Sequence, residues 1–268
     1  CLKSNYSKIH IDTSIKCSND IKLTSEEIFS RTKIILNKIK RNKKLRKIFL
    51  IIGTEVPLSG GNDKSKIKLT SETQIIEEVK KFKKILKSIN LINKTFGLVI
   101  EPGMKFMDYQ IQIPKLKNFK NKQKLSKKNK FVYEAHSTDY QSKSILKKLV
   151  NNNFKFLKVG PELTYNYCRS LFLMEKIERL YQFPISSNFE KKIMNTMRKN
   201  KKYWKNYYSG NKKKLNNLLL NSKLDRMRYY LNAQNVTKSI ALLRKNINKT
   251  EQSKIMKYLK KRKIIFNN

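Results

Sequence analysis

The stretch FVYEAHSTDYQ, residues 131–141, and the stretch FLKVGPELTY, residues 156–165, decide the expected fold of this chain. In each stretch a short β-prone run ends in polar or turn-forming residues, and a helical pattern begins after them. Parallel α/β barrels are built in this way, because each strand fixes the backbone and the residues at its C-terminal end line the barrel mouth. The two stretches therefore predict two consecutive β/α units with reactive side chains at one edge of a sheet.

Three upstream runs have the same form, so the sequence predicts five strands, at 8–12, 47–53, 96–101, 131–136 and 154–159. Helices are expected between them, and the first two begin at capping residues near Thr24 and Ser71. Alternation of strands and helices predicts a parallel sheet with right-handed crossovers. An open doubly wound sheet also fits this alternation, although no GxGxxG follows the first strand and no P-loop is present.

The basic composition does not by itself indicate a nucleic-acid-binding protein. The formal net charge is +43, but only 10 of the 62 basic residues are arginine, the residue that nucleic-acid sites favour. Lysine, asparagine, isoleucine, phenylalanine and tyrosine all have A/T-rich codons, so an A/T-rich genome explains the charge equally well. We expect the excess lysine to lie on solvated surfaces and nucleic acid not to be a partner.

Cysteine usage and hydropathy point to the cytoplasm. The three cysteines, Cys1, Cys17 and Cys168, are odd in number and form no CxxC pair, which is typical of free thiols in a reducing compartment. No apolar run approaches the ~18 residues of a membrane-spanning helix. We therefore expect a cytoplasmic protein with no membrane partner.

The expected strands all end in residues that carry charge or form turns. A single glutamate at a strand end is more often a surface or capping residue, but several such ends at one edge are typical of a barrel mouth. Carboxylate, imidazole and ammonium groups that converge there can transfer protons and bind phosphate. The candidate mouth residues are Asp12, Glu55, Glu134, His136, Asp139 and Lys158.

Ser137, Thr138 and Gly160 are candidates for phosphate binding. They follow the last two expected strands, where barrels often hold phosphate on backbone amides. Plainer roles are open for all three, because Ser137 and Thr138 can cap the next helix and Gly160 can simply form a tight turn.

No metal site is expected in this chain. Histidine occurs only at positions 10 and 136, so a three-histidine zinc centre is excluded, while two histidines and a carboxylate remain an option in principle. We interpret His136 as a hydrogen-bonding residue of the mouth and His10 as a satisfied residue within its strand. No catalytic Ser-His-Asp order or reactive cysteine is apparent.

Seven segments, in this order, resemble the non-catalytic subunit of class II D-tagatose-1,6-bisphosphate aldolase, the GatZ/KbaZ family. They are KIHIDTSIKCSND, IIGTEVPLSGG, LVIEPGMKF, FVYEAHSTDYQ, FLKVGPELTY, YWKNYYSG and LDRMRYYL. The resemblance implies a TIM-type (β/α)8 barrel in which residues 1–187 supply strands four to eight. Residues 188–268 are expected to form a mainly helical extension packed on that barrel. Because the family has three earlier strands and a longer C-terminus, we expect a truncated chain, either a fragment or the product of a decaying gene.

The resemblance also implies a supporting, chaperone-like function. Such a subunit maintains the activity and stability of a zinc-dependent catalytic subunit, which cleaves tagatose 1,6-bisphosphate to glyceraldehyde 3-phosphate and dihydroxyacetone phosphate. The expected partner is that catalytic subunit, with a sugar phosphate as a further candidate ligand. Zinc is expected in the partner, and no cofactor is expected in this chain.

Three other hypotheses stay open. The chain can be an independent barrel enzyme that acts on a phosphorylated sugar through the mouth residues. It can be a polyanion-binding protein, in which case its affinity for RNA would fall steeply with salt. It can also be a non-functional remnant that does not accumulate as folded protein.

Overall fold

The computed structural model describes residues 6–17, 20, 23–40, 47–53, 69–114 and 119–261, and all elements below lie within these ranges. The chain divides into two compact units. The first contains the described residues up to Phe106 together with Gln110–Val159, and the second contains Met107–Tyr109 and the described residues from Gly160 onward.

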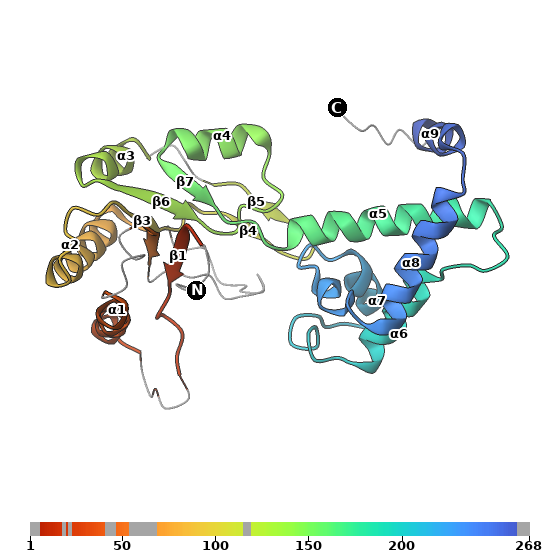
Figure 1. Ribbon diagram of the computed structural model, residues 1–268, viewed down its shortest axis with the longest axis horizontal. Coiled ribbons are helices and arrows are strands. Elements are labelled where there is room, and N and C mark those ends of the chain that lie inside the picture. The colour runs from red at the N-terminus through yellow and green to blue at the C-terminus, as the bar shows by residue number, and fades with distance from the viewer. Residues whose placement is uncertain are drawn as a thin grey trace. The chain divides into compact units, whose positions relative to one another are not determined.

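The first unit is an α/β domain in which strands and helices alternate (Figure 1). The five strands expected from the sequence are all present within one or two residues of their predicted ends. The elements, in chain order, are β1 (Lys8–Ile11), α1 (Ser25–Ile39), β2 (Phe49–Ile52), α2 (Glu72–Ser88), β3 (Phe96–Val99), β4 (Lys105–Phe106), β5 (Ile111–Gln112), α3 (Phe119–Lys128), β6 (Phe131–Ala135), α4 (Lys143–Asn151) and β7 (Phe154–Leu157).

Five of these strands form one parallel sheet in the order β1-β2-β3-β6-β7. The spatial order follows the chain order, whereas a doubly wound sheet reverses its order at a switch point. The predicted α/β class with a parallel sheet is therefore confirmed. The two remaining strands, β4 and β5, pair with each other in an antiparallel manner.

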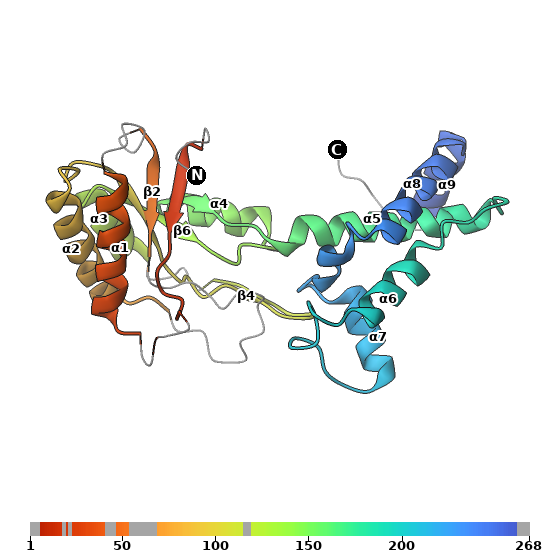
Figure 2. The same ribbon diagram turned by 60° about the horizontal axis from the view of Figure 1, so that its bottom comes forward.

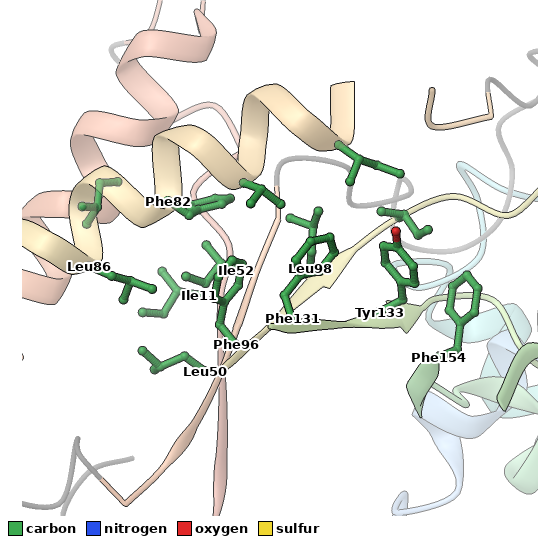
Figure 3. Packing of buried hydrophobic residues seen from close by; sticks show 14 of the residues in the cluster. Ile11, Leu50, Ile52, Phe82, Leu86, Phe96, Leu98, Phe131, Tyr133 and Phe154 are labelled. Carbon is green, nitrogen blue, oxygen red and sulfur yellow. The ribbon is translucent and has the colours of Figure 1, made fainter. Parts of the chain in front are cut away.

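One face of the sheet carries the hydrophobic core, and helices α1, α2, α3 and α4 cover it. Successive strand residues point to opposite faces, so every second side chain reaches this side. Figure 3 shows Phe82 and Leu86 of α2 pointing toward strand residues such as Ile52. Figure 2 shows α1 and α2 running beside each other next to β2. The strand residues of the core are Ile11, Leu50, Ile52, Phe96, Leu98, Phe131, Tyr133, Ala135 and Phe154.

The helix starts predicted from capping residues are confirmed. Thr24 and Ser71 each accept a backbone N–H from the residue three positions on, and the side chain at that position accepts the cap residue's own N–H. Two otherwise orphaned donors are satisfied at each end in this way. Ser142 caps α4 through its side chain alone.

The connection at residues 104–130 contains β4, β5 and α3. The lysine-rich α3 is anchored by Phe119, which is buried against Phe154 with 5.6 Å between ring centroids. The Tyr133 hydroxyl also donates to the Lys122 carbonyl over 2.7 Å. The buried residues of α3 are Phe119, Lys122 and Ser126, and the Lys122 ammonium lies 4.6 Å from the centroid of the Phe119 ring.

The second face of the sheet is concave. The rings of Phe49 on β2 and Phe156 on β7 have centroids 5.0 Å apart. The ammonium Nζ of Lys8 on β1 lies 2.6 Å from the carboxylate Oε2 of Glu134 on β6. Each pair is separated by three strand spacings, about 14 Å across a flat sheet. Side chains that stand upright on a flat sheet do not meet over that distance, so the sheet is curled and these residues face its inner side.

The second unit is helical. It contains α5 (Pro161–Leu180), α6 (Phe189–Lys199), α7 (Lys212–Asn221), the 3-10 helix η2 (Arg226–Tyr230), α8 (Gln234–Asn248) and α9 (Gln252–Lys261). No helix in the described part of the chain is both long and apolar enough to cross a membrane.

Helix α5 belongs to this second unit, whereas the sequence had placed residues 1–187 together. The reason lies in its buried side chains. Glu178 accepts hydrogen bonds from the Ser187 backbone, the Ser187 hydroxyl and the Asn246 amide, at 3.0, 2.6 and 2.6 Å. Phe172 packs on Phe189 with 5.2 Å between ring centroids. The pattern of α5 alone does not reveal which neighbours these residues will meet.

Candidate functional site

Four side chains meet on the concave face of the sheet, and we call them the Glu134 cluster: Lys8, His10, Glu134 and His136. Lys8 and His10 lie on β1, Glu134 lies on β6, and His136 follows β6 directly. Spacing by two residues places both members of each pair on the same face. The curl of the sheet then brings the two pairs together across β2 and β3.

Glu134 is the centre of this cluster, and its side chain is fully buried. Its Oε2 accepts a hydrogen bond from Lys8 Nζ at 2.6 Å, and its Oε1 lies 3.0 Å from His136 Nε2. The same Oε1 is 3.4 Å from His10 Nδ1. The two imidazole rings stand edge to face with centroids 5.5 Å apart. Carboxylate, ammonium and imidazole groups are thus held within direct contact of one another.

Two members of the cluster, Glu134 and His10, have pKa values shifted away from neutrality. Burial favours the protonated form of Glu134, but hydrogen bonds from His136 and Lys8 outweigh burial and lower its pKa to about 2. Burial lowers the pKa of His10 from 6.5 to about 4, and the nearby Lys158 acts in the same direction. At neutral pH Glu134 is therefore ionised and His10 is neutral. A general acid or base works best with a pKa near the operating pH, which neither group has.

His10 differs from the sequence interpretation. Its Nε2 is buried and has no hydrogen-bond partner within the described residues, so the expectation of a satisfied strand histidine was wrong for this atom. The reason is its surroundings: its register partner on β2 is the apolar Ile51, and the Glu134 oxygens contact Lys8, His136 and the other nitrogen of the His10 ring. Buried polar atoms without a partner are uncommon and mark strain or a missing ligand.

The other predicted mouth residues have diverse environments. Asp12 accepts hydrogen bonds from the backbone and hydroxyl of Ser14 at 2.9 and 2.6 Å, which fixes the turn after β1. Asp139 is buried and Lys158 is exposed. Glu55 lies outside the described residues. The structure thus brings Glu134 and His136 into contact and places Lys158 close enough to influence His10.

The residues predicted to bind phosphate lie at the end of β6 and at the start of α5. Thr138 directs both its backbone N–H and its hydroxyl to the Lys158 carbonyl, at 3.3 and 2.9 Å, and so joins the ends of β6 and β7. Ser137 adopts a left-handed conformation with φ of 54°. Neither residue caps α4, because Ser142 does. Gly160 is the N-cap residue of α5 in the second unit. Phosphate binding by Ser137, Thr138 and Gly160 stays a prediction.

Lys8 and His10 are the members of the cluster that the sequence analysis did not predict for the mouth. The alternation in KIHI, residues 8–11, already places Lys8 and His10 on one face of the strand, which was the available signal. No local pattern joins His10 with His136. In the structure His10, Glu134 and His136 offer ligand atoms for a metal ion that all lie within 4.8 Å of one another.

Residues 1–265 match the family described as "D-tagatose-1,6-bisphosphate aldolase subunit GatZ/KbaZ-like". The chain is 29% identical over 260 residues to the D-tagatose-1,6-bisphosphate aldolase subunit GatZ of Escherichia coli O6:K15:H31 (strain 536 / UPEC), with 92% of this chain and 61% of that protein covered. The GatZ subunit of Salmonella dublin is 27% identical over 255 residues, with 91% of this chain and 60% of that protein covered. The chain thus spans about three-fifths of the length of these curated relatives.

A solved structure has the same fold. It is the crystal structure of a probable tagatose 6 phosphate kinase from Sinorhizobium meliloti 1021, and the two chains superpose with a TM-score of 0.82 at 22% identity. The match covers 95% of this chain and 64% of that one. At this identity the likeness supports the fold alone. The family match over residues 1–265 goes further: this chain belongs to the D-tagatose-1,6-bisphosphate aldolase subunit GatZ/KbaZ-like family.

Proposed function

We propose that this chain acts as the accessory, non-catalytic subunit of a class II tagatose-bisphosphate aldolase. In that role it supports the activity and stability of a zinc-dependent catalytic subunit in tagatose, galactitol or amino-sugar catabolism in the cytoplasm. The observation that carries the proposal is the family match over residues 1–265. Curated relatives that carry the name of this aldolase subunit support it.

The geometry of the concave face favours an accessory role over independent catalysis. Glu134 is already held by Lys8 and His136, and both donors of Thr138 are used by the Lys158 carbonyl. A catalytic mouth directs such groups toward the reacting atoms of a substrate. Here they hold strand ends together, which suits a chain whose task is to present a stable surface to a partner.

We also propose that the five parallel strands correspond to strands four to eight of a TIM-type barrel. Three features support this assignment: the strand order follows the chain, α1 to α4 all cover one face, and the opposite face is concave. A barrel has the same three properties, because each right-handed crossover places its helix outside a closing sheet.

The accessory role is tested by co-expression of this chain with the cognate catalytic subunit. With an affinity tag on the catalytic subunit only, this chain is expected to co-purify in a fixed ratio. As a matched control, the same tagged subunit is expressed with an unrelated lysine-rich protein of similar size, because a charge of +43 can cause nonspecific retention. Retention that disappears at moderate salt, as for the control protein, would contradict a specific complex.

An independent enzyme acting on a phosphorylated sugar is the second candidate, and the Glu134 cluster is the observation that favours it. Carboxylate, imidazole and ammonium groups in contact can carry out acid–base chemistry. This candidate predicts that the pure chain turns over a sugar phosphate and that Glu134→Gln abolishes the turnover.

A polyanion-binding role requires affinity for RNA that survives competitor at physiological salt.

A further inference from the structure

The Glu134 cluster contains a donor set that metal ions use. Two imidazole nitrogens and one carboxylate oxygen are supplied by His10, His136 and Glu134, from two strands that are not neighbours in the sheet. Catalytic zinc sites use this combination of two histidines and one carboxylate, and leave a further coordination position open. Iron(II) and other divalent transition ions accept the same donors.

The spacing of the donor atoms fits a single ion. With bonds of about 2.0–2.1 Å and tetrahedral angles, two ligand atoms of zinc stand about 3.3 Å apart. Glu134 Oε1 lies 3.0 Å from His136 Nε2 and 3.4 Å from His10 Nδ1. All three ligand atoms lie within 4.8 Å of one another, so small side-chain rotations close the site.

The surroundings of the three donors resemble those of a metal centre. Lys8 holds the second carboxylate oxygen, Oε2, which leaves Oε1 free to face the two imidazoles. Such outer hydrogen bonds orient ligating carboxylates in metalloproteins. His10 is the most weakly held member, since its Nδ1, the nitrogen that faces Glu134 Oε1, makes only a long contact of 3.4 Å. A coordinate bond would fix this ring.

We infer that His10, Glu134 and His136 form a binding site for one divalent transition metal ion, with zinc as the ion to test. This inference goes beyond the accessory role, which places zinc only in the partner subunit. Lys8 and Lys158 add positive charge nearby, so the open coordination position favours an anionic ligand such as hydroxide or a phosphate oxygen.

The test is a zinc titration of the full, tag-free chain by calorimetry, followed in parallel by NMR of the imidazole nitrogens. Because the chain has only two histidines, every imidazole signal comes from the proposed site. Cys1 and Cys17 are replaced by serine, since an exposed thiol such as Cys17 binds zinc on its own account. The expected result is one zinc per chain, with both imidazole signals shifting at the same metal ratio.

Variants separate the proposed site from adventitious binding. We expect the dissociation constant for zinc to rise more than about 100-fold in each of three variants, His10→Gln, His136→Gln and Glu134→Gln. Loss of a residue that only hydrogen-bonds to a metal ligand typically weakens binding by about 10–100-fold. Glu77→Gln on α2 is the matched control, because it removes an exposed carboxylate that lies outside the Glu134 cluster, and it is expected to leave the affinity within a few-fold.

The inference is overturned if zinc does not saturate at one per chain, or if the imidazole signals stay in place during the titration. It is also overturned if the glutamine variants bind as tightly as the parent chain. Where a variant fails to fold, the imidazole signals of the parent chain decide the question alone.

Discussion

Replacement of Glu134 by glutamine is expected to destabilise the metal-free chain strongly at neutral pH. Glutamine has nearly the same shape but carries no charge, so the change removes the ionic partner of Lys8 and the acceptor facing His136. The packing around the side chain stays the same. The variant therefore isolates the electrostatic contribution of a fully buried carboxylate that links β6 to β1 across a curled sheet.

The expected magnitude follows from the pKa of Glu134. Its pKa falls from 4.5 in the unfolded chain to about 2 in the folded one, and each unit corresponds to 1.36 kcal/mol. The ionised side chain thus stabilises the fold by about 3 kcal/mol at pH 7, at the lower end of the 3–5 kcal/mol lost when one partner of a buried ion pair is removed. Because the pKa is lowered on folding, this stabilisation is complete above pH 4.5 and disappears as the pH falls toward 2.

Urea unfolding in the presence of a chelator, at pH 7 and at pH 3, measures this contribution. The parent chain is expected to exceed Glu134→Gln in free energy of unfolding by about 3 kcal/mol at pH 7 and by clearly less at pH 3. The matched control is Glu77→Gln on the exposed side of α2, which should change stability by no more than about 0.5 kcal/mol. A difference below about 1 kcal/mol at pH 7, or one independent of pH, would refute the ion-pair reasoning.

Three further predictions concern other parts of the chain. Burial raises the pKa of Asp225 from 3.8 to about 6, so folding takes up a proton and stability falls as the pH rises through this window. Asp225→Asn is therefore expected to raise the free energy of unfolding by up to about 3 kcal/mol at pH 7 and by little at pH 4. An unchanged pH profile in urea unfolding would contradict this. A Cβ at Gly97 would overlap Ile51 Cδ1, so Gly97→Ala should cost about 1–3 kcal/mol, and Ile51→Val, which lacks that atom, should recover part of the loss in a double-mutant cycle. Thr24→Ala should cost about 1 kcal/mol through the lost cap of α1 while Thr24→Ser does not, as judged by thermal unfolding; equal effects of the two changes would exclude the capping explanation.

Local signals in the sequence were sufficient for the elements of the first unit. Short apolar runs such as FLII and FGLV, at residues 49–52 and 96–99, predict buried parallel strands because both faces of such strands are covered. Hydroxyl residues followed by Glu27 or Gln74 predict helix starts, because the hydrogen bonds of a cap connect residues only three positions apart. These are interactions between near neighbours in the chain.

Long-range geometry was not accessible in the same way. The contact between Lys8 and Glu134 joins residues 126 positions apart, and it depends on the curl of the sheet, which no single strand encodes. The same reason explains why the sequence predicts His10 to be a satisfied residue within its strand and does not place it beside Glu134. The assignment of α5 to the second unit likewise depends on partners such as Asn246, which lies 68 positions after Glu178.

The central claim is that this chain supports a catalytic partner and is not itself the catalyst. The measurement that tests it most directly is the rate of tagatose 1,6-bisphosphate cleavage by the cognate catalytic subunit, purified alone and together with this chain. The account predicts no cleavage by this chain alone, and a higher rate with a longer half-life when both chains are present. Folded, soluble chain that leaves both the rate and the half-life of the catalytic subunit unchanged would contradict it.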